Sequence, residues 1–516
     1  MRRQEPPVTA VQQEARRRRW RRLPLTLLAL AVGVAGLLVL VIGLPTLWRY
    51  SGESVHHYAD PETHFRHGSI GSEVSGLPVR LWRVLPSLFP EVFDDGHFEV
   101  FGFLYAPGDE ASGGDLPIGV GTRQVRGVEI AWFNCALCHV GTVRESPDAP
   151  VRQIAGMPSN NLDLYGFIDF LLEIADDPRL APDSVLAAMD EQGQSLGWIE
   201  RRVWRHAVLP RVREGLLENR ALLGPLLAVQ PAWGPGRVDT FNPYKLIQFG
   251  MEVAELEEAE RIGTSDFPAV FLQRPRQGME LHWDGNNASL QERNLSAAIG
   301  AGVTEESVDH RAIERVADWL LDLEPPPSPY RPDPEGVAAG QSLYMRHCAD
   351  CHGYQDGDRY VFEGARLGRV EPNARLGVDP ARLDSYTETL RRYQLTLFDD
   401  DERYRFRHFR KTDGYANLPL DGLWLRAPYL HNGAVPTLYD LLLPPEERPE
   451  AFVRGLDVLD AEKGGFVAPA CTPGEPLEAG FCFDTSQPGN GRLGHDYGTE
   501  LTPEERSALL DYLLTF

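Results

Sequence analysis

Two pentapeptides of the form Cys-x-x-Cys-His constrain this chain more than any other feature. They are Cys135-Ala-Leu-Cys138-His139 and Cys348-Ala-Asp-Cys351-His352. At this spacing both thiols can form thioether bonds to porphyrin vinyl groups, and the adjacent histidine is placed under the iron. With six cysteines and fourteen histidines in the chain, one such box is expected by chance only ~0.002 times. The sequence therefore predicts two covalently bound haem c groups, held by the four thiols and ligated by His139 and His352.

The alternative is a four-cysteine zinc site made from the two CxxC pairs, or a redox CxxC. Neither explains the two histidines that follow the pairs, and a thioredoxin-like box would need a βαβ context that this sequence lacks. The two other cysteines, Cys471 and Cys482, have ten residues between them in a stretch rich in glycine and proline. We predict that they pair as a structural disulfide.

The N-terminus differs in kind from the rest of the chain. Residues 1–22 contain eight arginines against Glu5 and Glu14, a net charge of +6, and residues 23–44 are apolar and uncharged. An apolar run of this length can span a bilayer, and the positive-inside rule keeps the arginine-rich arm in the cytoplasm. This pattern predicts a single-pass protein of the inner membrane, anchored in lipid, with most of the chain periplasmic or extracytoplasmic. A cleaved signal peptide is the alternative, but its apolar core would be shorter and end in a small-x-small site.

The net charge of −24 conceals this basic arm, because subtracting its +6 leaves −30 on residues 23–516. Such an acidic surface repels phosphate, so no nucleic-acid partner is expected. A basic redox partner protein or a small hydrophobic substrate suits it better.

The organisation of the chain predicts a mainly α fold with two tandem cytochrome c-like haem domains after the membrane helix. Residues 325–335 are rich in proline, and this composition predicts a stiff linker. They separate an N-terminal domain at 50–324, which has helical insertions, from a C-terminal domain at 336–516. A helix is expected at the end of each domain, over 312–323 and after the capping box Thr502-Pro-Glu-Glu505.

A loop sequence also occurs in both domains. His282-Trp-Asp-Gly-Asn-Asn-Ala-Ser-Leu290 in the first resembles His431-Asn-Gly-Ala-Val-Pro-Thr-Leu438 in the second. The order of haem box, glycine-containing loop and closing helix therefore occurs twice.

The second axial ligand of each iron decides whether the haem only passes electrons or also binds a small oxidant. All six methionines lie at or before Met345, so the second haem has only His408, His431 and His495 downstream of its box. His408 lies in an arginine-rich segment and His431 heads the repeated loop. His495, just before the last helix, is therefore our candidate for the sixth ligand.

No methionine or histidine is marked as the partner of His139, although five upstream histidines remain open, at positions 56, 57, 64, 67 and 97. The simplest interpretation is an open or weakly ligated iron. Phe271 and Trp283 are candidates for its distal pocket, while simple core packing is the alternative for both.

These motifs together resemble the bacterial dihaem cytochrome c peroxidase superfamily over roughly residues 115–516. They are the two CxxCH boxes, the HWDG loop, Leu425-Arg-Ala-Pro-Tyr-Leu-His-Asn-Gly-Ala-Val-Pro-Thr-Leu438, and the closing segment around His495. The closing segment looks most like the dihaem rubber oxygenase branch. That resemblance implies a C-terminal haem with two histidine ligands and an N-terminal haem that binds oxygen.

The chain also departs from the peroxidases. The loop reads HWDGN instead of FWDGR, Gln291 with Glu292 beside it stands at the position of the catalytic glutamate, and no methionine can ligate the second iron. These departures disfavour an ordinary peroxidase.

The sequence thus predicts a haem-dependent oxidoreductase, dioxygenase-like or peroxidase-like. Oxygen or peroxide would react at the first haem, and electrons would pass through the second. A pure electron-transfer dihaem cytochrome is the alternative.

Overall fold

The computed structural model describes residues 27–34, 36–37, 40–41, 44, 48, 51–93, 97–106 and 116–516. The chain divides into two units. One comprises Met1–Val55 and Gln124–Glu129, where the amide of Arg126 donates to the carbonyl of Gly52 at 3.1 Å. The other comprises His56–Arg123 and Ile130–Phe516. Both CxxCH boxes belong to this second unit.

The α-helices in chain order are α3 (Pro61–His67), α4 (Val79–Leu88), α5 (Cys135–His139), α6 (Leu164–Glu173), α7 (Pro182–Glu191), α8 (Trp198–Val203), α9 (Leu209–Leu227), α10 (Asn242–Phe249), α11 (Leu290–Gly300), α12 (His310–Leu320), α13 (Pro334–His347), α14 (Ala349–His352), α15 (Asn373–Leu376), α16 (Ala381–Ser385), α17 (Glu388–Gln394), α18 (Leu438–Leu441) and α19 (Pro503–Leu513). The strands are β1 (Glu53–Val55), β2 (Leu77–Pro78), β3 (Val120–Val125), β4 (Val128–Phe133), β5 (Val140–Val143), β6 (Arg152–Ala155), β7 (Arg237–Asp239), β8 (Thr264–Asp266), β9 (Tyr354–Asp356), β10 (Arg359–Val361), β11 (Val370–Pro372), β12 (Gly414–Ala416), β13 (Ala451–Arg454) and β14 (Phe481–Asp484). The expected helices at the ends of both domains are present as α12 and α19, and the capping box Thr502–Glu505 forms.

The mainly α prediction was wrong, because the fold is mixed α/β, with 41% of residues helical and 13% in strands. Antiparallel pairs form between β5 and β6, β7 and β8, β9 and β10, β11 and β12, and β13 and β14. These strands are three or four residues long. Segments this short carry almost no alternating pattern, so periodicity could not reveal them.

The expected membrane helix over 23–44 is also corrected. Among the described residues, no helix is both long and apolar enough to cross a bilayer. Residues 27–34 of this segment are helical, whereas residues 23–26, 35, 38–39 and 42–43, and the arginine-rich arm at 1–22, lie outside the described residues. The prediction of a single-pass inner-membrane protein is therefore not supported.

One large hydrophobic cluster of the second unit combines residues from both predicted haem domains. Met157 and Phe271 from the first pack with Trp424, Leu438 and Leu509 from the second, all nearly inaccessible to solvent. Burial of aromatic and aliphatic side chains at this scale is the main stabilising contribution to such a unit. Side chains from both predicted domains therefore share this cluster, which Cys348 of the second box adjoins.

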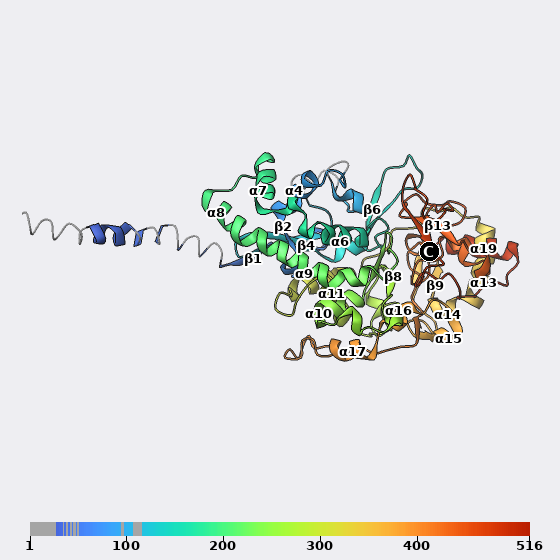
Figure 1. Ribbon diagram of the computed structural model, residues 1–516. Helices are drawn as coiled ribbons and strands as arrows, with labels where there is room; N and C mark the ends of the chain where they lie inside the picture. Colours follow the sequence, from blue (N-terminus) through green and yellow to red (C-terminus); the bar gives the residue numbers. More distant parts are fainter. Residues whose placement is uncertain are drawn as a thin grey trace, which may run out of the picture. The chain divides into compact units, whose positions relative to one another are not determined.

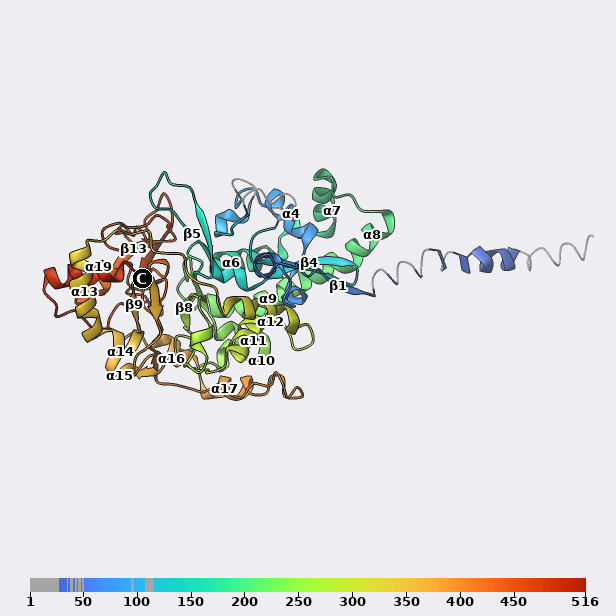
Figure 2. The same cartoon turned by 180° about the vertical axis from the view of Figure 1, so that it is seen from behind.

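Helices α13 and α19 pack side by side, as both views show (Figure 1, Figure 2). Gly340 of α13 faces the backbone of α19 so closely that a Cβ atom there would lie 1.9 Å from the carbonyl oxygen of Ala508. Because α13 runs directly into the second haem box, this contact sets the position of that box against the end of the chain.

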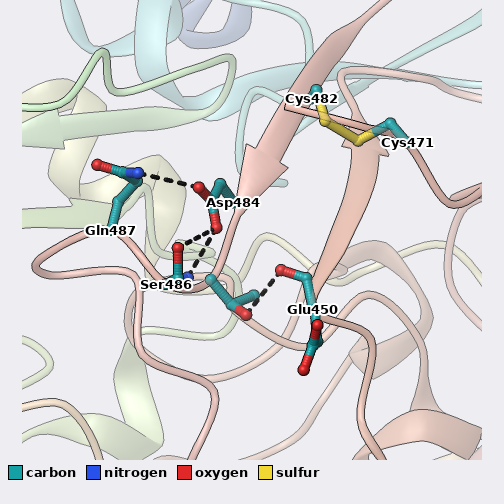
Figure 3. The surroundings of a disulfide bond; sticks show 7 residues. Glu450, Cys471, Cys482, Asp484, Ser486 and Gln487 are labelled. Atoms are coloured by element: carbon teal, nitrogen blue, oxygen red, sulfur yellow. Dashed lines mark hydrogen bonds between the residues drawn. A yellow bond between two sulfur atoms is a disulfide. The ribbon is translucent and has the colours of Figure 1, made fainter. Parts of the chain in front are cut away.

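The disulfide between Cys471 and Cys482 joins the segment that connects β13 and β14 to the start of β14 (Figure 3). Arg454, the last residue of β13, donates to the carboxylate of Asp266 at 3.0 Å, and Arg237 lies 3.4 Å from the same carboxylate. Burial raises the pKa of Asp266, and the two guanidinium groups oppose that rise. This buried ion cluster connects β13 with β7 and β8.

Candidate functional site

The first CxxCH box forms helix α5. The side chain of Asn134 caps this helix by accepting a hydrogen bond from Ala136 at 2.9 Å, and it donates to the carbonyl of Gly68. Cys135 and Cys138 have no disulfide partner and are half-buried. The box is therefore a fixed helical turn that carries two thiols with two residues between them.

The second box spans the junction of α13 and α14. Cys348 is the C-cap of α13, and Cys351 and His352 follow in α14. Both thiols are again half-buried and free of any disulfide. Each box is followed at once by the first strand of a hairpin, β5 in the first case and β9 in the second.

The two box histidines have the same hydrogen bond. Nδ1 of His139 lies 2.9 Å from the carbonyl oxygen of Pro268, and Nδ1 of His352 lies 2.8 Å from that of Leu418. A carbonyl only accepts, so each Nδ1 carries the proton and each Nε2 keeps its lone pair. Burial lowers the pKa of His139 to about 4 and also lowers the pKa of His352, so burial favours the neutral form of both rings. This is the arrangement that metal-ligating histidines have in proteins.

The second site has a further histidine opposite the first. The rings of His352 and His495 have centroids 6.3 Å apart with 46° between their planes. A bond from a metal to an imidazole nitrogen is about 2 Å long, so two imidazoles on opposite sides of one iron have ring centroids about 6 Å apart. Burial lowers the pKa of His495 to about 3, with His352 and Arg448 adding to the effect. The separation fits one haem iron between two neutral histidines.

The loop that carries His495 is fixed by a residue that sequence analysis missed. The guanidinium of the buried Arg448 donates to the carbonyl oxygens of Arg492, Gly494 and His495 at 2.8, 2.7 and 3.2 Å. His495 itself has a φ of 52°, in the left-handed region that non-glycine residues rarely adopt. Only the arginine-rich composition of the chain could have drawn attention to Arg448, because its partners are backbone atoms far along the sequence.

The other candidate histidines for the second iron have partners elsewhere. Nδ1 of His408 lies 2.5 Å from the carboxylate of Glu292, and the ring of His431 stacks on Tyr415 with centroids 4.1 Å apart. Nε2 of His431 also lies 3.0 Å from the hydroxyl of Tyr415. Of the three, His495 is the one whose ring contacts that of His352.

The first site lacks such a pair. Within the described ranges, no second histidine ring faces that of His139. Among the upstream histidines left open by the sequence, Nε2 of the buried His64 lies 3.2 Å from the carbonyl of Ser69, and His57 lies 3.5 Å from the carboxylate of Asp309. The two sites therefore differ in the ligands that the described chain offers.

Phe271 and Trp283, the candidates for the distal pocket, lie in different clusters. The ring of Phe271 contacts Gly156, whose amide donates to the carbonyl of His139 at 2.8 Å. Trp283 packs against the cluster of Leu376, Val378, Leu383 and Tyr415. The distal role of both residues stays a prediction.

Trp283 is connected by hydrogen bonds to segments from both predicted domains. Its indole N–H donates to the carbonyl of Asp266 at 2.8 Å, and its own carbonyl accepts from the amide of Ala416 at 2.8 Å. Asp266 is two residues from Pro268, which holds His139, and Ala416 is two residues from Leu418, which holds His352. A path of short covalent segments and four hydrogen bonds thus joins the two box histidines through Trp283.

The repeated loop is confirmed as a structural repeat, with a register shift of one residue. Leu281 bridges to Asn287 in the first copy, and Tyr429 bridges to Val435 in the second. Each loop ends at the N-cap of a helix, Ser289 before α11 and Thr437 before α18. His282 is therefore equivalent to Leu430, with φ of 65° and 70°, and Trp283 is equivalent to His431.

Glu292, beside the position of the peroxidase glutamate, is occupied in holding a loop. Its carboxylate accepts from the backbone amides of Arg407 and His408 at 2.8 and 3.0 Å and from the side chain of Asn287 at 3.0 Å. Gln291 is exposed. Gln291 has no carboxylate, and the carboxylate of Glu292 is engaged in these hydrogen bonds. Neither residue therefore replaces the proton-transferring glutamate of the peroxidases.

The zinc alternative finds no geometric support. Across the described part of the chain, no three histidine, cysteine, aspartate or glutamate side chains come together as a metal site. Each CxxC pair is followed by its own histidine, His139 after the first and His352 after the second.

A family match falls on the segment between the second box and His495. Residues 414–453 match the RoxA-like, cytochrome c-like family. This segment contains β12, the repeated loop with His431, and all of β13 except its last residue. A cytochrome c-like domain implies haem c and an oxidoreductase role of the cytochrome c kind. The match supports the rubber oxygenase-like branch of the resemblance, and no comparison supports the wider dihaem peroxidase superfamily.

Two relatives come from Sinorhizobium fredii (strain NBRC 101917 / NGR234). The uncharacterized protein y4iM is 29% identical over 260 residues, which are 45% of this chain and 57% of that protein. The uncharacterized protein y4iJ is 41% identical over 110 residues, which are 20% of this chain and 17% of that protein. The chain thus matches less than two thirds of the length of either relative.

Proposed function

We propose that this protein is a dihaem oxidoreductase with unlike haem sites. Oxygen or peroxide chemistry belongs to the site of His139, and electron transfer belongs to the site of His352 and His495. When bound, a haem with one protein ligand supplies a position for a small oxidant, and a haem with two supplies reversible one-electron transfer.

The observation that carries this proposal is the unequal supply of ligands. His495 faces His352 with ring centroids 6.3 Å apart. Among the described residues, His139 has no such partner, while its Nδ1 is held by Pro268 in the same way as that of His352 by Leu418. The two box histidines are held in the same way, but only His352 has a histidine opposite it. This difference favours different functions for the two sites.

The residues of this chain have defined tasks in the proposal. Pro268 and Leu418 orient the two imidazoles and fix which nitrogen faces the iron. Arg448 holds the loop of His495, and Trp283 connects the two sites by its hydrogen bonds to Asp266 and Ala416. Electrons would pass along this connection.

The net charge of the chain indicates which kind of electron donor or acceptor it would bind. With a net charge of −24, the chain would attract a basic redox partner protein and repel polyanions. A small hydrophobic substrate is the other candidate, since the matching family supports the rubber oxygenase-like branch.

An electron paramagnetic resonance spectrum of the oxidised holoprotein tests the proposal. We expect one low-spin haem, from the site with two histidines, and one high-spin haem. Two low-spin haems without a high-spin signal would instead favour a pure electron-transfer cytochrome. Turnover of peroxide with a reduced small cytochrome would separate an ordinary peroxidase from the other two functions.

A further inference from the structure

His282 and Arg293 are half-buried polar residues near the first haem site for which the proposed function gives no role. His282 lies in the repeated loop, with a φ of 65°. A non-glycine residue in this region costs free energy, and the cost is kept only where the surroundings fix the residue. In the second copy the equivalent residue is Leu430. The same backbone therefore presents an imidazole in one site and an apolar side chain in the other.

The imidazole of His282 has a defined tautomer. Its Nδ1 lies 2.7 Å from Oδ1 of Asn286, an acceptor, so Nδ1 carries the proton. Burial lowers the pKa of His282 to about 4, so the ring is neutral near pH 7. Its Nε2 has a lone pair and no hydrogen-bond partner among the described residues. It is an available proton acceptor at a half-buried position.

Arg293 lies near both histidines of this site. It belongs to α11, and its positive charge contributes to the lowered pKa of His139 as well as that of His282. Burial and the charge of Arg276 lower the pKa of Arg293 to about 10, so the guanidinium is still charged at neutral pH. It donates to the side chain of Asn294 through Nε and Nη2. No acidic side chain within the described ranges forms an ion pair with Arg293.

An apolar cluster joins His282 to the first haem attachment. Cys135 packs against the cluster that contains Phe409 and Leu295, the latter from α11. The ring of Phe409 has its centroid 6.5 Å from that of His282. His282, Arg293 and Cys135 therefore surround the same region of the fold.

His282 does not have the ring contact with His139 that a second axial ligand of the same iron would have. In the second site the two ligand rings are 6.3 Å apart. No comparable contact between His139 and His282 exists in the described chain. His282 is thus near the first site without the spacing of an iron-ligating pair.

We propose that His282 and Arg293 form the polar distal side of the first haem site, where they bind a small, weakly acidic inorganic ligand HX. The H–X bond breaks, the proton passes to Nε2 of His282, and the resulting anion is stabilised by the guanidinium of Arg293. Hydrogen peroxide belongs to this class of ligand. This inference rests on the proposed function, which leaves the first iron open on one side.

Cyanide binding to the oxidised holoprotein tests the inference, with hydrogen cyanide as the probe HX. His282→Leu introduces the residue that the second loop already has in this conformation, and Arg293→Met removes the charge. Losing a hydrogen bond to a charged group costs about 1.5–3 kcal/mol, so we expect Kd for cyanide to rise about ten- to a hundredfold in each variant. The exposed His206, changed to Leu, is the matched control and keeps the parent Kd.

The low-spin signal of the second site reports whether each variant is folded, independently of cyanide. If the parent binds cyanide and neither variant weakens it, the inference is overturned while the proposed function stands. Conversion of a low-spin haem to high-spin by H282L would also overturn it, because His282 would then be an axial ligand. A parent protein that binds no cyanide contradicts the proposed function itself.

Discussion

At the scale of single residues, the two sites differ in whether a second histidine lies opposite the histidine of the CxxCH box. His139 and His352 are held by backbone carbonyls, as their Nδ1 contacts show. His495 stands opposite only one of them. Such a difference depends on one side chain, so single substitutions can test it.

We expect His495→Ala to convert the second haem from low-spin to high-spin, with nearly complete loss of that low-spin signal. The variant would then bind carbon monoxide at both reduced haems. His408→Ala is the matched control, because that histidine contacts Glu292 instead of His352. An unchanged low-spin signal in H495A would show that another residue ligates the iron.

His64 predicts a dependence of stability on pH. Burial lowers its pKa to about 4, Arg315 and His57 add to the effect, and the carbonyl of Ser69 and the carboxylate of Asp309 oppose it. The unfolded chain, with a histidine pKa of about 6.5, binds more protons between these values, so the contribution to stability is complete above pH 6.5 and is lost toward pH 4.

Thermal unfolding of His64→Gln at pH 7 and pH 5 measures this contribution. We expect the melting temperature to fall less between these pH values in H64Q than in the parent. The exposed His206→Gln keeps the parent difference. An equal difference in H64Q and the parent would mean that His64 is protonated in the folded state.

At the scale of elements, the close contact of α13 and α19 makes Gly340 sensitive to any side chain. Because a Cβ atom would lie 1.9 Å from the carbonyl of Ala508, Gly340→Ala must force the helices apart. Overpacking of this kind costs about 1–3 kcal/mol. We therefore expect a lower melting temperature and a disturbed spectrum of the second haem.

Gly215→Ala in α9 is the control, since nothing lies within 4 Å of the Cβ position there. Alanine is the better helix former by about 1 kcal/mol, so this variant should be no less stable than the parent. If G340A were as stable as G215A, the two helices would not be in the contact described here.

Sequence patterns predicted the longer helices but not the short strands. The amphipathic face over 312–323 predicted α12, and the capping box at Thr502 predicted the start of α19. The short hairpins were missed because three or four residues cannot establish a period. The motif spacing predicted the box histidines as iron ligands, and elimination left His495 as the candidate that lies opposite His352. By contrast, Pro268, Leu418 and Arg448 act through backbone contacts across long sequence separations, which no local pattern encodes.

At the scale of the whole molecule, one compact unit contains both CxxCH boxes and a shared hydrophobic cluster. Trp283 links the two box histidines through hydrogen bonds to segments of both predicted domains. A reaction at the first site could therefore exchange electrons with the second without a change in the fold. The central claim is that these two haems are unlike.

Carbon monoxide titration of the fully reduced holoprotein tests this claim most directly. Carbon monoxide binds a haem whose sixth position is free, and the amount of haem follows from the pyridine haemochrome spectrum. We predict two haems per chain and one bound carbon monoxide per two haems. Binding at neither haem, or equal binding at both, would contradict the account.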